Sequence, residues 1–252
     1  MPKQHEGMGT INQEVSKEMK FYFDGDSFTY GGGLERIGIV REDVRWSKLV
    51  CDHFGAEEVN LSYGGACNEK VMRHLFTKPP TEVYDFYFLQ TTIPIRGEFY
   101  DRRKKRWIGY SHECGKHGNL LDKCKSRWGR VEGPKFADWI NFGLSRIYTD
   151  ELGKTRETVA LNAMKAYVAS VGRSNRSFFS TLLKPTETDN KYDMYFKGTH
   201  DAERGECEWP PGLFRYDKIP NDGHPSVEGH KTIAKYVIDI VSERLRDEGS
   251  VC

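Results

Sequence analysis

Three short stretches of the sequence hold residue types that together could carry out acyl transfer. Ser27 closes the run Gly25-Asp26-Ser27, and a serine hydroxyl becomes a nucleophile when a neighbouring base takes its proton. His224 follows Asp222 by two residues, which supplies a base and a carboxylate that can orient it. The pair Gly64-Gly65 lets a backbone N–H approach a ligand closely, as a donor to a developing oxyanion must.

Each stretch also has an ordinary structural explanation when it is taken alone. Gly-Asp-Ser is common in turns, a Gly-Gly pair suits a tight strand-to-helix turn, and an Asp near a histidine can cap a helix. Together, in the order Ser, Gly-Gly and Asp-x-His, the three stretches outweigh these separate explanations and favour one site.

The elements that must position these stretches alternate along the chain. Short apolar runs predict strands, and apolar residues that repeat with a period near 3.6 predict helices. We expect strands at 21–23, 57–62, 84–91 and 176–183, and helices at 42–54, 66–76, 134–149, 155–171 and 226–246. This order predicts a parallel sheet with helices on both faces. Ser27 and Gly64-Gly65 then fall at the carboxyl ends of strands, where such sheets bind ligands.

Length and composition fit one α/β domain with a well-solvated surface. The chain has 252 residues, of which 37% are hydrophobic and 30% are charged. We expect a polar tail over residues 1–20 and a single domain over 21–252, with long insertions near 97–132 and 184–220. The glycines at 31–33 indicate an open loop. The formal net charge of +1 gives no whole-molecule reason to expect a nucleic acid or an anionic membrane as partner.

Taken together, the stretches resemble the sequence blocks of the SGNH hydrolases, also called the GDSL esterase/lipase family. Gly25-Asp26-Ser27 resembles the first block, and Asn60 to Gly65 resembles the second. Asp222 to Pro225, followed by Gly229-His230, resembles the last. The resemblance implies a flavodoxin-like, three-layer α/β/α sandwich of the SGNH type, and an ester hydrolase that uses no metal or organic cofactor.

The resemblance also implies a role for each matched residue. Ser27 is the expected nucleophile, His224 the general base, and Asp222 the group that holds the imidazole. The backbone N–H groups of Ser27 and Gly65 are the expected oxyanion donors. The family usually has its Asp three residues before the His, where this chain has Asn221. Either Asp222 reaches the ring, or the site is closer to a Ser-His dyad.

A second departure concerns the third block, which reads Gly-x-Asn-Asp in the family. Thr92 falls where the oxyanion-hole Asn is expected, so we assign Thr92 to the oxyanion hole. The pattern Thr-x-Pro-x-Arg-x-Glu that begins at Thr92 resembles SGNH-like proteins of tailed phages and some bacteria. The expected substrate-binding residues are Asp26, Asn68, Gln90 and Arg96.

Two charged features have more than one interpretation. Arg96 and Glu98 either recognise a polar substrate or form a structural ion pair that fixes their loop. The run from Arg102 to Arg106 could contact phosphate or a polyanion, although we expect it to be a solvated face.

The cysteines are expected to be free thiols. All six are scattered, at positions 51, 67, 114, 124, 207 and 252, and residues 1–20 lack the apolar run of an export signal. Cys114, His117 and Cys124 could bind zinc with a distant fourth ligand, but their spacing matches no common structural zinc site. We therefore expect no metal.

The expected function is a serine esterase that removes a short, acetyl-type acyl group. Its substrate would be a small-molecule or carbohydrate ester, with no nucleic acid or membrane as partner and with an oligomeric state that the sequence does not indicate. The alternative is a catalytically weak or inactive SGNH-fold protein, such as a virion or glycan-binding component. The lack of an export signal predicts a cytoplasmic location, in the host cytoplasm or a virion if the source is viral.

Overall fold

The structure is a computed structural model. It describes residues 19–77, 83–93, 96–111, 133–139, 150–181, 192–196 and 222–249, together with 124, 131, 142, 213–214 and 218–219. Most of the expected N-terminal tail therefore lies outside the described residues. No helix in the described part of the chain is long and apolar enough to cross a membrane.

Six strands form one sheet in the order β2-β1-β3-β6-β7-β8, and every pairing between neighbours is parallel. Their bounds are β1 Lys20–Asp24, β2 Glu57–Asn60, β3 Phe86–Thr91, β6 Ser177–Thr181, β7 Met194–Phe196 and β8 Leu213–Phe214. The chain moves from β1 to β2 on one side and then returns to β3 on the other. This reversal creates a topological switch point at the carboxyl end of β1, where sheets of this kind bind ligands.

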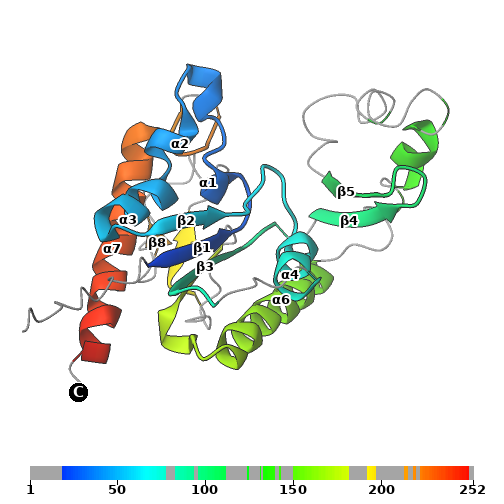
Figure 1. The fold of residues 1–252 in the computed structure, drawn as a ribbon. Coiled ribbons are helices and arrows are strands. Elements are labelled where there is room, and N and C mark those ends of the chain that lie inside the picture. Colours follow the sequence, from blue (N-terminus) through cyan, green and yellow to red (C-terminus); the bar gives the residue numbers. More distant parts are fainter. Residues whose placement is uncertain are drawn as a thin grey trace, which may run out of the picture.

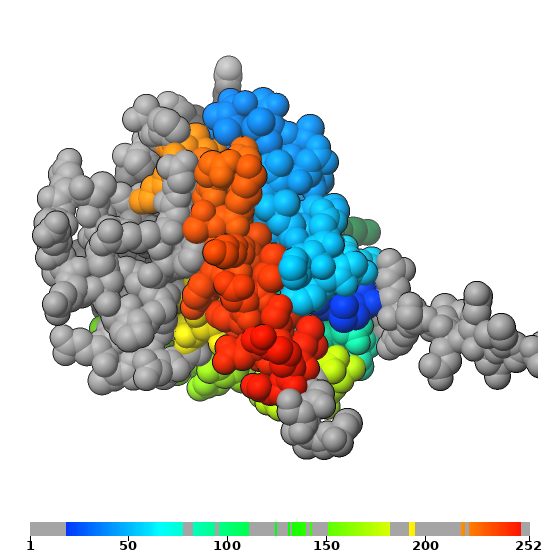
Figure 2. Space-filling view, turned by 90° about the vertical axis from the view of Figure 1, so that its left-hand side faces the viewer, coloured from blue at the N-terminus to red at the C-terminus, as the bar shows by residue number. Residues whose placement is uncertain are grey.

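Helices cover both faces of this sheet (Figure 1). The helices are α1 Ser27–Tyr30, α2 Arg41–Val44, α3 Trp46–Phe54, α4 Asn68–Thr77, α6 Asp150–Ser170 and α7 Val227–Gly249, with 3-10 turns η1 Leu34–Ile37 and η4 Ser174–Arg176. α3 and α7 pack on one face, and α4 and α6 pack on the other. Figure 2 shows α7, in orange to red, lying beside the blue surface of α2 and α3. The expected three-layer α/β/α fold class is confirmed.

Two hydrophobic cores hold these layers together. Because alternate residues of a strand point to opposite faces, Phe23 and Phe88 face one core while Tyr22 and Tyr87 face the other. Phe23 stacks on Phe88 with ring centroids 4.4 Å apart, and Trp46 of α3 packs edge-on against Phe23. These side chains are fully buried, so they fix β1 and β3 as the rigid centre from which the site extends.

The structure differs from the expected elements in three places. The helix expected over 42–54 is two helices, because Arg45 has an extended backbone (φ −62°, ψ 144°). The insertion near 97–132 begins with an antiparallel hairpin, β4 Arg96–Asp101 and β5 Arg106–Ser111, where no regular pattern was expected. The insertion near 184–220 contributes β7 and β8, whose three and two residues are too short to show a period.

Candidate active site

Ser27 lies at the switch point, on a sharp turn between β1 and α1. Asp26, with an extended backbone, caps α1 by accepting a hydrogen bond from the Phe28 N–H at 3.0 Å. Ser27 is the first residue of the helix and is partly exposed. A Cβ on Gly25 would lie 2.6 Å from Gln90 Cβ, so only glycine fits where the turn passes over β3.

A buried polar network supports this turn from below. The Asp26 carboxylate is fully buried and accepts from Gln90 Nε2 at 2.9 Å and from Arg96 Nη1 at 2.7 Å. Gln90 also accepts from Thr29 Oγ1 at 2.6 Å. Because a buried carboxylate needs such partners, its oxygens are directed into the protein. Asp26, Gln90 and Arg96 therefore position the serine turn, and the substrate contact expected for them does not fit their burial.

The acid and the histidine of the last stretch are paired. Asp222 Oδ1 lies 2.7 Å from His224 Nδ1, and Asp222 Oδ2 accepts from Arg36 Nη1 at 3.2 Å. Backbone bonds between Ile219 and the residues Asp222 and His224 close the turn that brings the two side chains together. Asp222 thus reaches the ring from two residues away, while Asn221 lies outside the described residues.

Two glycines bring Ser27 close to this pair. A Cβ on Gly32 would lie 2.8 Å from Ser27 Cβ and 3.1 Å from His224 Cδ2, and one on Gly33 would lie 2.8 Å from Asp222 Oδ2. The side chains of Ser27, Asp222 and His224 therefore pack against the same backbone segment. The described residues show no hydrogen bond from Ser27 Oγ to His224, and without substrate this bond is often long.

The expected open loop at 31–33 is therefore a packed part of the site. Gly33 and Gly31 have φ values of 87° and 86°, in the left-handed region that favours glycine, whereas at Gly32 the requirement is the lack of a side chain. The sequence signal was the glycine run itself, but the run does not show which side chains need the space. Ser27 is close in the sequence, whereas Asp222 and His224 come from the other end of the chain.

The Gly64-Gly65 turn lies beside the serine turn. The Tyr63 N–H donates to the Gly25 carbonyl at 3.2 Å, and the rings of Tyr30 and Tyr63 are 5.9 Å apart. Gly65 is exposed, has a φ of 75°, and has no atom within 4 Å of an added Cβ. Within the described part of the chain, the N–H groups of Ser27 and Gly65 make no hydrogen bond, so both can serve a ligand.

Thr92 occupies a different environment from the one expected. It is fully buried, its N–H donates to Asn68 Oδ1 at 2.7 Å, and its carbonyl accepts from Asn68 Nδ2 at 3.4 Å. Its Oγ1 is buried without a hydrogen-bond partner among the described residues. A hydroxyl in this position does not face a substrate oxyanion, so the expected role of Thr92 does not fit. Asn68 holds Thr92 in place, which likewise differs from the substrate contact expected for it.

Arg96 and Glu98 do not pair with each other. Arg96 binds Asp26, whereas Glu98 accepts from Arg73 Nε at 2.7 Å and Nη2 at 2.9 Å. Both residues therefore form structural ion pairs, which was one of the two interpretations, but each pairs with a different residue.

Two further histidines near the site, His74 and His230, have hydrogen-bond partners that the sequence analysis did not predict. His74 Nδ1 lies 2.7 Å from the buried Asp24 carboxylate, just before Gly25. Burial raises the pKa of Asp24, and the contact with His74 partly offsets that effect. His230 is fully buried, and its Nδ1 accepts from the Trp46 N–H at 3.3 Å. Burial, together with the charge of His224, lowers the pKa of His230 to about 3, so His230 is neutral and structural.

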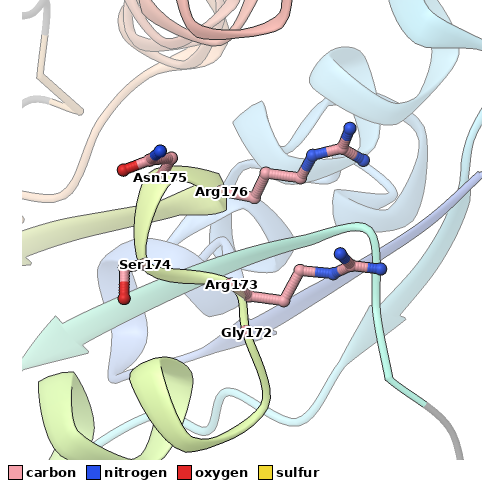
Figure 3. A pocket seen from close by; sticks show the side chains of 5 residues that line it. All are labelled: Gly172, Arg173, Ser174, Asn175 and Arg176. Atoms are coloured by element: carbon pink, nitrogen blue, oxygen red, sulfur yellow. The ribbon is translucent and has the colours of Figure 1, made fainter. Parts of the chain in front are cut away.

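Among the described residues there is no metal site, and the pocket that residues 172–176 line lies away from this site. Within the described residues no group of three His, Cys, Asp or Glu side chains could hold a metal ion; Cys114 and His117 lie outside them, and Cys124 is buried. A pocket of about 310 Å³ is lined by residues 172–176 (Figure 3). This segment precedes β6, at the amino end of the sheet, opposite Ser27.

Comparisons with known proteins identify similar structures only. No family model matches the sequence, and no curated protein matches it. The esterase EstA from Pseudoalteromonas sp., in a structure inhibited by monoethylphosphonate, is 12% identical; the match covers 91% of this chain and 100% of that chain, with a TM-score of 0.42. A carbohydrate esterase whose active site displays divergent catalytic and non-catalytic binding functions is 13% identical, over 91% of this chain and 70% of that chain, with a TM-score of 0.44.

A member of the lipolytic G-D-S-L family from Veillonella parvula is 13% identical, over 89% of this chain and 98% of that chain, with a TM-score of 0.33. The similar structures include SGNH or GDSL-type hydrolases and carbohydrate esterases, the class that the sequence blocks resemble. The narrower resemblance to phage and bacterial proteins stays a prediction.

Proposed function

We propose that the protein is a serine ester hydrolase. The observation that carries this proposal is the packing of Ser27, Asp222 and His224 against Gly32 and Gly33 at the switch point of the sheet. A nucleophile, a base and an orienting carboxylate are the three groups that acyl transfer through an acyl-enzyme needs.

The geometry supports a role for each of the three groups. Asp222 accepts from His224 Nδ1, which leaves Nε2 as the basic nitrogen. His224 takes the Ser27 proton as Oγ attacks the ester carbonyl, and then gives that proton to the leaving alcohol. Water, activated by the same histidine, attacks the acyl-enzyme and releases the acid and the free Ser27 hydroxyl. The N–H groups of Ser27 and Gly65 stabilise the oxyanion in both steps.

The substrate class is a short-chain acyl ester, of the acetyl type, carried by a carbohydrate or a small polar molecule. Support comes from the surroundings of the serine turn, where the exposed ring of Tyr63 lies 5.9 Å from the ring of Tyr30 and the Arg41 guanidinium lies 3.8 Å from the centre of the Tyr30 ring. A sugar ring offers an apolar face to such aromatic side chains and hydroxyls to polar ones.

A second candidate is an SGNH-fold protein that binds its ligand with little or no turnover. The buried hydroxyl of Thr92 favours it, because the third block then contributes no side-chain donor to the oxyanion hole. Loss of one such donor typically lowers kcat by about 10² to 10³.

The test is turnover of p-nitrophenyl acetate. We expect Ser27→Ala to lower kcat/KM by at least about a thousandfold, with an unchanged melting temperature. Ser170→Ala, at an exposed serine of α6, is the matched control and should behave like the wild type. Equal turnover by the Ser27→Ala protein would contradict the proposal, and a folded wild type that binds esters without turnover would support the second candidate.

A further inference from the structure

A row of cations and aromatic rings leads from the Gly64-Gly65 turn to the tip of the hairpin β4–β5. Lys70 Nζ lies 3.9 Å from the ring centre of Tyr63, and Arg73 Cζ lies 4.8 Å from that of Trp107. Lys70 and Arg73 are three residues apart on α4 and so share one face of that helix. We call this surface the cation–aromatic strip; its members are Tyr63, Lys70, Arg73, Tyr100, Trp107 and the turn 102–106.

Strand β4 of the hairpin connects the cation–aromatic strip with the serine turn. Side chains of alternate residues share one face of a strand, so Arg96, Glu98 and Tyr100 lie on the same face of β4. Arg96 binds Asp26, and Glu98 binds Arg73 of α4. The ring of Tyr100 pairs with that of Trp107 across the hairpin, with ring centroids 5.6 Å apart. The strand rises by one residue spacing five times between Arg96 and Asp101, which is about 17 Å, so the tip of the hairpin lies several sugar units from Ser27. In Figure 1 the hairpin extends beyond α4, away from the sheet.

The aromatic members of the strip are exposed in spite of their size. Tyr63, Tyr100 and Trp107 are 57%, 48% and 47% exposed. None of these three side chains belongs to the two hydrophobic cores of the domain. Large exposed rings that follow one another along a surface are typical of a binding surface for ring-shaped ligands.

The hairpin tip concentrates positive charge. Arg102 to Arg106 are five consecutive cations, and all five are exposed. Within the described residues, Arg102, Lys105 and Arg106 form no ion pair. Asp101 holds the turn by accepting from the backbone N–H groups of Arg103 and Lys104 at 2.9 and 3.0 Å. Because the whole chain carries a net charge of only +1, these five cations are a local concentration of positive charge.

We propose that the cation–aromatic strip binds the chain of an acidic polysaccharide whose acyl ester lies at Ser27. This inference rests on the proposed function. The exposed rings stack on the apolar faces of successive sugars, and the cations pair with carboxylate or sulfate groups of the same chain. A nucleic acid would satisfy the charges and the rings, but its backbone carries no acyl ester for Ser27 to attack.

The kinetic test compares two acetylated polymers, a polyuronate and a neutral xylan, as substrates. We expect the wild type to prefer the polyuronate, and the triple variant Arg102→Ala, Lys105→Ala, Arg106→Ala to lower the ratio of kcat/KM for acidic over neutral polymer about tenfold. The same ratio should fall for the wild type when NaCl is raised from about 0.05 to about 0.5 M, because salt screens exposed charges. A matched triple variant at exposed lysines of α6 and α7, Lys154→Ala, Lys231→Ala, Lys235→Ala, removes the same charge elsewhere.

Binding measured without turnover separates this inference from the proposed function. Ser27→Ala protein should bind the polyuronate by calorimetry, and should lose most of this affinity with the hairpin triple variant or with Trp107→Ala. If the Ser27→Ala protein binds the polyuronate in this way while the wild type hydrolyses no ester, the proposed function is wrong, but the cation–aromatic strip still binds the acidic polysaccharide. No preference for the acidic polymer, an equal effect of the α6 and α7 variant, or tighter binding of a single-stranded oligonucleotide than of the polyuronate would overturn the inference.

Discussion

Arg96 Nη1 lies 2.7 Å from Asp26 Oδ2, in an ion pair that joins the first residue of the hairpin to the residue before Ser27, the proposed nucleophile. Both side chains are buried, the Asp26 carboxylate completely. The turn that presents Ser27 and the arm that extends from the site are therefore parts of one structure, and a change at one end of the pair must affect the other.

Removing this arginine should destabilise the protein strongly. Arg96→Ala leaves the Asp26 carboxylate buried without its cation, and we expect the free energy of unfolding to fall by about 3–5 kcal/mol. Urea denaturation measures this change. Arg36→Ala is the comparison, because Arg36 is 75% exposed in its ion pair with Asp222 and should cost less than about 1 kcal/mol. Similar losses in the two variants would show that the Asp26–Arg96 pair does not support the turn.

The space at Gly32 should matter for activity more than for folding. The Cβ of a Gly32→Ala variant would lie 2.8 Å from Ser27 Cβ and 3.1 Å from His224 Cδ2, so one of the two side chains must move. We expect kcat to fall by about 10², the usual effect of misplacing reacting groups by about 1 Å. In Gly109→Ala, where the nearest atom is 3.8 Å away, the turnover of p-nitrophenyl acetate should be unchanged. A fully active Gly32→Ala protein would mean that Ser27 and His224 do not meet at this glycine.

Thr92→Val should have little effect on turnover. The Thr92 hydroxyl is buried and lacks a hydrogen-bond partner among the described residues, so its replacement by a methyl group removes a desolvation penalty. We expect kcat to change by less than about tenfold, compared with about 10² to 10³ for an essential oxyanion donor. The melting temperature should stay the same or rise. A loss of more than about a thousandfold in a folded variant would return Thr92 to the catalytic machinery.

His230 should make the protein less stable in acid. The ordinary pKa of histidine is 6.5, and burial lowers that of His230 to about 3 in the folded protein. Between these values the unfolded chain binds a proton that the folded chain does not, so stability falls as pH decreases from about 6.5 towards 3. From pH 7 to 4.5 this one group should lower the free energy of unfolding by about 2–3 kcal/mol.

Denaturant unfolding of the wild type and of His230→Gln over this pH range measures that contribution. The variant lacks the titrating group, so its stability should fall less steeply by that amount. Parallel pH profiles for the two proteins would show that His230 does not titrate as described.

The sequence predicts those parts of the fold and site that depend on local patterns. The apolar run before Asp24 marks β1, the strand expected at 57–62 contains β2, and the residues after both strands lie at the carboxyl edge of the sheet. The spacing of Asp222 and His224 also allows their contact, because a short turn can place side chains two residues apart together.

What the sequence does not predict depends on partners far along the chain. Asp26 and Gln90 are polar residues near a candidate site, and only their burial against each other, 64 residues apart, separates support of the turn from contact with substrate. The hairpin was missed because its strands mix charged, aromatic and glycine residues without a period of two, around a basic turn that resembles a solvated loop.

The most direct test of the account is covalent labelling of Ser27. A fluorophosphonate reacts with a serine hydroxyl only where a base activates it, so intact-protein mass spectrometry should show one adduct, placed on Ser27 by peptide mapping. The adduct should be absent from Ser27→Ala and should form far more slowly in His224→Ala. An adduct on another serine, or equal labelling of the Ser27→Ala protein, would contradict the account.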